Sequence, residues 1–191
     1  MGMTVQRRKD SKFPSVIMHK VADIRGGVAV NVTELGGDYL REGAVLSAPD
    51  EKGICHVVKT AVLVEEASAT EVNLKVAKGH TFKVGDFVMA KEGAKAYAIT
   101  KIVTTDKKLD TLTIGTTLGE KIAKGACIVE AKAQATTADS ALKYQPFAIA
   151  GTGKPIIKGD NLDTDAWVMA VTKGNPLPAC VESKLKGIIN Y

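Results

Sequence analysis

The chain has 191 residues, of which 45% are hydrophobic, 25% are charged and 5% are aromatic. This composition is that of a folded globular protein and argues against extended disorder. The formal net charge of +5 permits an anionic partner, but the lysines are dispersed and no apolar stretch is long enough to span a bilayer. We therefore expect no membrane partner, and a core built from small and β-branched side chains.

Residues 1–35 are predicted to form an extended N-terminal arm. Glycine pairs at 26–27 and 36–37 interrupt this segment. Between them, residues 28–33 alternate between valine and smaller or polar residues, which is typical of a short strand. An arm of this kind is available to lie against another protein.

A compact basic run lies inside this arm. It consists of Arg7, Arg8 and Lys9, with Lys12 nearby, and Phe13 follows directly. No aromatic residue interleaves with the run, as a binder of single-stranded nucleic acid would require, so we do not expect nucleic acid as a partner. Nucleic-acid binding through this run is kept as an alternative, which predicts an affinity that falls steeply with salt. No apolar segment follows the basic residues, so we also expect no secretory signal.

A short pattern occurs twice and begins a third time, at a spacing of about forty residues. In each copy an apolar residue, two spacers and a glycine precede further apolar residues, and the glycines are Gly43, Gly85 and Gly125. Turn-forming residues follow the first two copies and predict hairpins over 44–60 and 87–103. A single hairpin cannot bury its apolar face alone, so the repeats predict a β-barrel or sandwich built from repeated hairpin units.

The repeats define the expected domain organisation. A repeat-built β-barrel domain is predicted over 36–132, with further strands where apolar and polar residues alternate. The small, polar residues 131–140 predict a linker or weak helix. A C-terminal β segment over 133–191 is expected to contain a short helix over 176–187, which ends at Gly187.

The residue types that carry catalysis or bind metals are scattered. The three histidines, His19, His56 and His80, lie in different segments, and the three cysteines have no paired spacing, so we expect buried free thiols. Cys55 and His56 are adjacent, but neighbouring residues of a strand point to opposite faces.

Two further motifs lack residues that their chemistry needs. The segment Gly151-Thr152-Gly153-Lys154 lacks the first glycine and the final Ser or Thr of a phosphate-binding loop. The aspartates of the segment 159–165 lack the glycine and glutamate of an EF-hand. We therefore expect no enzyme, no cofactor and no metal site, with a small β-barrel hydrolase as the enzymatic alternative.

Several features along roughly residues 36–191 are shared with a known family. They are the Gly-x-Val-Leu and Gly-Asp-Phe-Val corners, the strands 99–102 and 111–114, and the C-terminal pattern Ala141-Leu142-Lys143-Tyr144, Ala166 to Val171 and Leu177-Pro178-Ala179, closing on Lys184-Leu185 and Ile188. In these features the chain resembles the phage head-fibre and capsid-decoration proteins, particularly those of phages and prophages of Bacteroides-like hosts.

This resemblance implies a structural virion protein on the outer capsid surface, assembled in the bacterial host cytoplasm. Such proteins are usually trimers, and their N-terminal region binds the major capsid protein. The arm over 1–35 would then be the capsid attachment, with Arg7, Arg8, Lys9, Lys12 and Phe13 as candidate contacts. The alternative is a carbohydrate- or host-surface-binding β module, because loops on β scaffolds often carry recognition. The small number of aromatic residues weakens that alternative.

Overall fold

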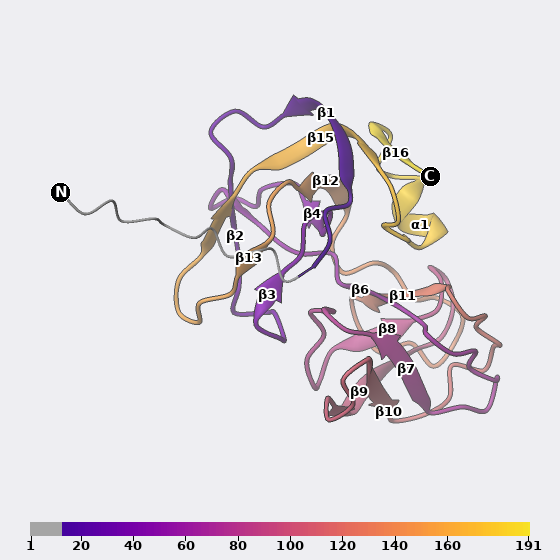
Figure 1. The fold of residues 1–191 in the computed structure, drawn as a ribbon. Helices are drawn as coiled ribbons and strands as arrows, with labels where there is room; N and C mark the ends of the chain where they lie inside the picture. Colours follow the sequence, from indigo (N-terminus) through magenta and orange to yellow (C-terminus); the bar gives the residue numbers. More distant parts are fainter. Residues whose placement is uncertain (1–12) are drawn as a thin grey trace.

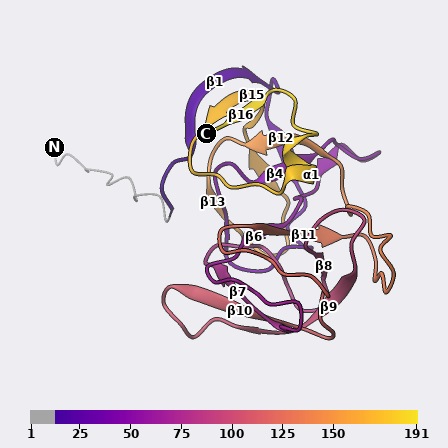
Figure 2. The same cartoon turned by 90° about the vertical axis from the view of Figure 1, so that its right-hand side faces the viewer.

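A computed structural model describes residues 13–191 and shows a mainly β protein with one short helix in that range. The chain forms two packed lobes (Figure 1). The terminal lobe comprises residues 13–58 and 141–191, and the central lobe comprises residues 59–140. A view turned by 90° shows the terminal lobe stacked on the central lobe (Figure 2). No helix of the described part is long and apolar enough to cross a membrane.

The terminal lobe contains three sheets and the helix. Its five-stranded sheet consists of β1 (Ile17–Asp23), β15 (Ala166–Thr172), β12 (Pro146–Ala150) and β4 (Val45–Ser47), with β16 (Ile188–Asn190) parallel to β15. A three-stranded sheet holds β14 (Leu162–Thr164), β2 (Val28–Val30) and β5 (Ile54–Cys55), and a two-stranded sheet holds β13 (Lys154–Pro155) and β3 (Tyr39–Leu40). The helix α1 spans Ala179–Glu182 and follows Pro178, whose fixed φ suits a helix start.

The central lobe is one antiparallel six-stranded sheet. Its order is β6 (Thr60–Val62), β11 (Cys127–Ala131), β8 (Phe87–Met89), β9 (Ala96–Val103), β10 (Leu109–Ile114) and β7 (Asn73–Ala77). An isolated bridge between Leu63 and Val76 brings β7 back towards the end of β6. None of the sheets in residues 13–191 closes into a barrel.

Apolar cores fill each lobe and join the two. The central lobe encloses a cluster with fully buried side chains from β7, β9, β10 and β11, including Leu74, Ile99, Leu112 and Ile128. A second cluster contains Met89 and Val129 of the central lobe together with Ile149 and Val181 of the terminal lobe. Because this cluster crosses the boundary, burial of apolar surface holds the lobes together.

The three repeat glycines occupy the same kind of turn. Gly43, Gly85 and Gly125 have φ values of +79°, +95° and +84°, which side chains rarely adopt. Each is the second residue before a strand, namely β4, β8 and β11. In each copy the amide of the residue after the glycine donates to a carbonyl three residues earlier, at 3.1–3.2 Å. The sequence repeat therefore corresponds to a repeated backbone turn.

Within the described range, the first 35 residues contain strands of the terminal lobe where an extended arm was predicted. Residues 17–23 form β1 along β15, and residues 28–30 form β2 between β14 and β5. These strands are part of the terminal lobe because C-terminal strands offer them backbone partners. Residues 1–12 of the predicted arm lie outside the described residues.

The predicted boundary at residue 36 also differs from the observed division. Residues 45–47 form β4, which pairs with β12 through Val45 and Ile149. The first repeat turn therefore belongs to the terminal lobe, and the other two belong to the central lobe. The helix is shorter than the predicted range 176–187 but falls inside it.

Candidate functional site

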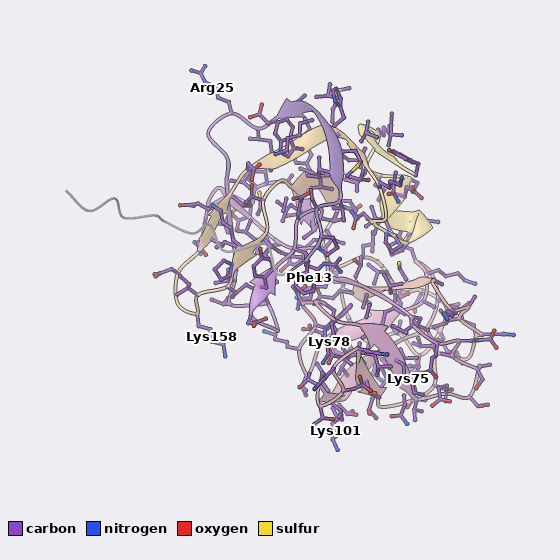
Figure 3. All side chains as sticks on the ribbon, in the orientation of Figure 1. Phe13, Arg25, Lys75, Lys78, Lys101 and Lys158 are labelled. Carbon is purple, nitrogen blue, oxygen red and sulfur yellow. The ribbon has the colours of Figure 1, made fainter. Side chains whose placement is uncertain are left out.

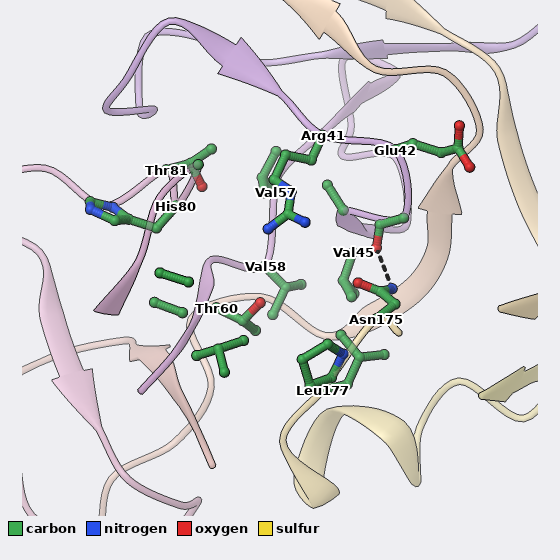
Figure 4. Close-up of a pocket in the computed structure, with 17 residues that line it drawn as sticks. Arg41, Glu42, Val45, Val57, Val58, Thr60, His80, Thr81, Asn175 and Leu177 are labelled. Atoms are coloured by element: carbon green, nitrogen blue, oxygen red, sulfur yellow. Dashed lines mark hydrogen bonds between the residues drawn. The ribbon is translucent and has the colours of Figure 1, made fainter. Parts of the chain in front are cut away.

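A small pocket lies at the junction of the two lobes (Figure 4). Arg41 extends towards it from the terminal lobe, and His80 and Thr81 border it from the central lobe. On the other side, the Nδ2 of Asn175 donates to the carbonyl oxygen of Gly43 at 3.0 Å. The cavity volume of about 70 Å³ is far below the several hundred Å³ that small-molecule sites usually occupy.

A larger cavity of about 750 Å³ also borders the junction, and the two cavities share Gly79 and His80. Aromatic and basic side chains line it, including Phe13, Tyr39, Lys78, Lys83 and Lys107. Its size is sufficient for a small ligand or for a peptide segment. The lining contains three lysines and two aspartates, and one lysine, Lys78, is paired with Asp110.

His80, Asp110 and Lys78 form a charged group in this second cavity. The Nζ of Lys78 donates to Oδ1 of Asp110 at 2.5 Å. Nε2 of His80 lies 3.3 Å from Oδ2 of Asp110, without an aligned hydrogen bond. Burial lowers the pKa of His80 and Lys78 lowers it further, which outweighs the opposite effect of Asp110. The imidazole is therefore held in its neutral form.

Phe13 is the predicted attachment residue that the structure describes, and it lies where the lobes meet (Figure 3). Its ring is 5.6 Å from the ring of Tyr39, and the guanidinium of Arg41 lies 4.8 Å from its centroid. The Phe13 ring also covers Gly79, where an added Cβ would approach it to 2.6 Å. Arg7, Arg8, Lys9 and Lys12 lie outside the described residues.

A chain of buried charges crosses the junction behind these cavities. The Nζ of Lys59 lies 2.6 Å from Oδ2 of Asp86 and 3.2 Å from Oε1 of Glu130. The same Glu130 oxygen accepts a bond of 2.9 Å from Lys143, which lies 3.5 Å from Glu34. The side chains of Lys59, Asp86 and Glu130 are at most 5% exposed. Ions so deeply buried are costly unless they are paired.

The pKa directions along this chain follow from burial and partners. Burial raises the pKa of Glu130 against the attraction of Lys59 and Lys143. Burial also tends to raise the pKa of Glu34, but the hydrogen bond from Tyr144 and the charges of Lys143 and His56 lower it overall. The carboxylate of Glu34 is therefore stabilised in its charged form.

Large apolar side chains are exposed mainly on one sheet. Of the eight such residues that are exposed within 13–191, six belong to the five-stranded sheet or directly follow its last strand. We call this group the apolar sheet surface: Met18, Val21, Phe147, Met169, Ile189 and Tyr191. The strand β1 forms the outer edge of this sheet, away from the central lobe (Figure 2). Exposed apolar residues beside an open strand edge are typical of a surface that pairs with another chain.

The other residues that the sequence singled out lie apart from one another. His19 is exposed on β1, and His56 stacks on Tyr144 beside Glu34. Cys55 and Cys127 are buried and Cys180 is half-buried, and all three are free thiols. Lys154 of the glycine-rich segment donates to the carbonyl oxygen of Asp163. Within residues 13–191 no group of three or more histidines, cysteines or carboxylates is placed to hold a metal ion.

Comparison with family models, with curated proteins and with solved structures gave no match for this chain.

The sequence did not predict the buried charge chain. A signal was present, because Asp86 directly follows a repeat glycine where the other two copies have Ala44 and Ala126. Glu130 likewise interrupts the apolar run Cys127-Ile128-Val129. A charged residue at a position that is apolar in the sister repeats is a sign of a specific buried partner.

Proposed function

We propose that this chain is a structural virion protein, a head-fibre or capsid-decoration protein that forms a homotrimer and binds the major capsid protein on the outer shell. The observation that carries the proposal is the apolar sheet surface, which a second and third copy of the chain would cover. The resemblance of the C-terminal pattern to capsid-decoration proteins supports the choice of a virion component.

The edge of the sheet supports self-association specifically. Strand β1 has a partner on one side, β15, and it contains two exposed apolar residues, Met18 and Val21, which are 51% and 56% exposed. Closed symmetry would give each copy the same contact and would remove the open edge. His19 and Lys20, which lie between these two apolar residues in β1, would limit open-ended pairing.

The attachment to the capsid is proposed for residues 1–13. The basic residues Arg7, Arg8, Lys9 and Lys12 offer positive charge to an acidic capsid surface. Phe13 sits against Tyr39 and Arg41 and would hold the end of this segment on the body of the protein.

The finer architecture is also part of this proposal. We infer that the hairpins after Gly43, Gly85 and Gly125 are three copies of one unit, which assemble into a sandwich-like scaffold. Two observations support this inference. The three glycine turns match, and each of β4, β8 and β11 pairs antiparallel with the chain that follows it. The pairs are Leu46 with Val57, Val88 with Tyr97 and Ala131 with Leu142.

Analytical ultracentrifugation of the full chain tests the oligomer. We expect a trimer at micromolar concentration, and a monomer for Met169→Lys, because the charge would lie in the interface. Val84→Lys is the matched control, since Val84 is 57% exposed but lies in the central lobe, and it should leave the trimer intact. A monomeric unmodified chain would contradict the proposal.

Cosedimentation with purified shells of the corresponding major capsid protein tests the attachment. We expect the combined change of Arg7, Arg8 and Lys9 to Ala to reduce shell binding at least tenfold. Arg25→Ala is the control, because Arg25 lies at the far edge of the terminal lobe (Figure 3). Equal loss in both variants, or no binding by the unmodified chain, would count against the attachment site.

The alternative of a carbohydrate-binding module has a weaker structural basis. A sugar-binding platform needs an open aromatic face. Trp167 is half-buried, its indole nitrogen donates to Asp165 at 3.1 Å, and the Nζ of Lys20 lies 5.0 Å from its ring centroid. Binding to a glycan array that is lost in Trp167→Ala would revive this alternative.

A further inference from the structure

Lys59, Asp86 and Glu130 form an unusually close and dry group. Their side chains are 0%, 5% and 2% exposed, and both carboxylates lie within 3.2 Å of the Nζ of Lys59. The residues come from neighbouring parts of one sheet: Lys59 precedes β6, Glu130 lies in β11 and Asp86 precedes β8. The amide of Glu130 donates to the carbonyl oxygen of Lys59 at 3.0 Å, which fixes their register.

The fold does not require charges at these positions. The residue after the repeat glycine is Asp86 in the second copy but alanine in the first and third. The fifth residue after the glycine is Glu130 in the third copy but alanine, Ala48 and Ala90, in the others. Lys59 is the sixteenth residue after its repeat glycine, and the residue at that position is Lys101 in the second copy and Ala141 in the third. The two buried carboxylates therefore need an explanation other than the hairpin itself.

We propose that Lys59 and Asp86 are the site of a spontaneous intramolecular amide bond, and that Glu130 transfers the protons of this reaction. The ion-pair distance of 2.6 Å holds Nζ of Lys59 beside the carboxyl group that it would attack. The reaction proceeds from a neutral amine and a neutral carboxylic acid, which the transfer of one proton from Nζ to Oδ2 would give.

The atoms balance without an additional reactant. The lone pair of Nζ attacks Cγ of Asp86 and the C–N bond forms. Glu130 accepts a proton from Nζ and returns a proton to the leaving oxygen of Asp86. The C–O bond then breaks and one water molecule is released. The product is an amide between the two side chains, and no group is oxidised or reduced.

Two further contacts suit this reaction. The backbone amide of Lys83 donates to Oδ2 of Asp86 at 2.8 Å and holds the carboxyl group in place beside Nζ of Lys59. Oε2 of Glu130 has no hydrogen-bond partner within residues 13–191, so it is available to carry a proton. Burial raises the pKa of Glu130, and the neighbouring Asp86 raises it further, which makes the carboxyl a better proton acceptor at neutral pH.

The charges that remain after the reaction are still paired. Condensation removes the positive charge of Lys59 and the negative charge of Asp86 together. Glu130 keeps its bond of 2.9 Å to Lys143. The amide would tie the beginning of β6 to the corner before β8 and would restrict the unfolded chain in the way a disulfide does.

The mass of the full chain, measured after denaturation, tests the proposal directly. We expect a mass lower than the sequence mass by one water molecule. A protease digest should then contain a branched peptide that joins the segments around Lys59 and Asp86, with no trypsin cleavage after Lys59. The full sequence mass for the folded chain would overturn the proposal.

Variants assign the roles. Lys59→Arg keeps a positive charge but has no reactive amine, and Glu130→Gln cannot accept the proton, so both should have the full sequence mass. Persistent loss of water in Glu130→Gln would overturn the role of Glu130. The pair of Lys78 and Asp110 is an internal control, because its atoms are equally close but Lys78 is 31% exposed. The peptides that contain Lys78 and Asp110 should be unlinked in the same digest. The branched peptide is measured in the unmodified chain, so the test is decisive even if a variant fails to fold.

Discussion

The hydroxyl of Tyr144 donates a hydrogen bond of 2.6 Å to Oε2 of Glu34, although 110 residues separate them. Tyr144 lies on the segment that returns from the central lobe to β12, and Glu34 lies in the loop between β2 and β3. The ring of His56 stacks on Tyr144, with centroids 4.3 Å apart and an interplanar angle of 13°. This contact therefore joins three separate segments where the chain passes between the lobes.

Tyr144→Phe should destabilise the protein by about 1 kcal/mol, because it removes one hydrogen bond to a partly buried carboxylate while keeping the stacked ring. Urea denaturation followed by fluorescence measures this change in the free energy of unfolding. Tyr97→Phe is the matched control, since Tyr97 is also half-buried but its hydroxyl forms no hydrogen bond within residues 13–191. Equal losses in the two variants would contradict the role of the Glu34 bond.

Because of His80, we expect the free energy of unfolding to fall in mild acid. Burial and Lys78 lower its pKa in the folded protein below the ordinary 6.5, against the attraction of Asp110. A lowered pKa means that the unfolded chain binds the proton more tightly. The stabilising contribution of neutral His80 is therefore complete above pH 6.5 and is lost as the pH falls through the lower folded value.

Unfolding measurements from pH 7.5 downwards test this behaviour. The free energy of unfolding should fall less steeply below pH 6.5 in His80→Gln than in the unmodified chain. His19→Gln replaces an exposed histidine of β1 and should leave the slope unchanged. If all three chains share one slope, His80 is not the group responsible.

Local patterns predicted the local structure of this protein. The repeated glycines mark equivalent positions because positive φ is readily adopted only by glycine, and Gly43, Gly85 and Gly125 all adopt it. The predicted helix range 176–187 contains α1, but the helix ends at Glu182 and not at Gly187. Strand β1 pairs with β15 through contacts such as Ile17 with Thr172, which are distant in sequence, and no local pattern specifies such a partner.

The buried charges escaped prediction for a related reason. Lys59, Asp86 and Glu130 are each ordinary in their own segments, and their meeting depends on the order of β6, β11 and β8 in the sheet. The sequence did not predict the apolar sheet surface either, because a methionine such as Met18 or Met169 looks the same in the sequence whether it is exposed or buried. Surface exposure of an apolar residue is decided by packing and not by residue type.

The three thiols should differ in reactivity. Burial raises the pKa of Cys127 to about 11, and its Sγ donates to the carbonyl oxygen of Pro176 at 3.3 Å. Burial and the charge of Asp50 raise the pKa of Cys55. Since the thiolate is the reactive form, only the half-buried Cys180 should react quickly with a thiol reagent at pH 8, at one equivalent per native chain.

Addition of denaturant should expose the other two thiols and raise the labelling to three equivalents. Cys180→Ser is the control, and it should remove the fast phase and leave the slow phase unchanged. Rapid labelling of Cys127 in the native chain would contradict its burial between β11 and the segment before α1.

Gly36→Ala should be among the most damaging small substitutions in the protein. An added Cβ would lie 2.0 Å from the carbonyl oxygen of Phe82, which belongs to the backbone of the other lobe and cannot rotate away. The free energy of unfolding should fall by about 3 kcal/mol, because the lobes must separate locally to admit one methyl group.

Gly115→Ala is the matched control, since neither glycine has a positive φ. The nearest atom to the Cβ added at Gly115 is the Cγ2 of Thr100, at 3.6 Å. Chemical denaturation should therefore show a large loss for Gly36→Ala and a change below about 1 kcal/mol for Gly115→Ala. Similar midpoints for the two variants would mean that the lobes approach less closely at Gly36 than the structure shows.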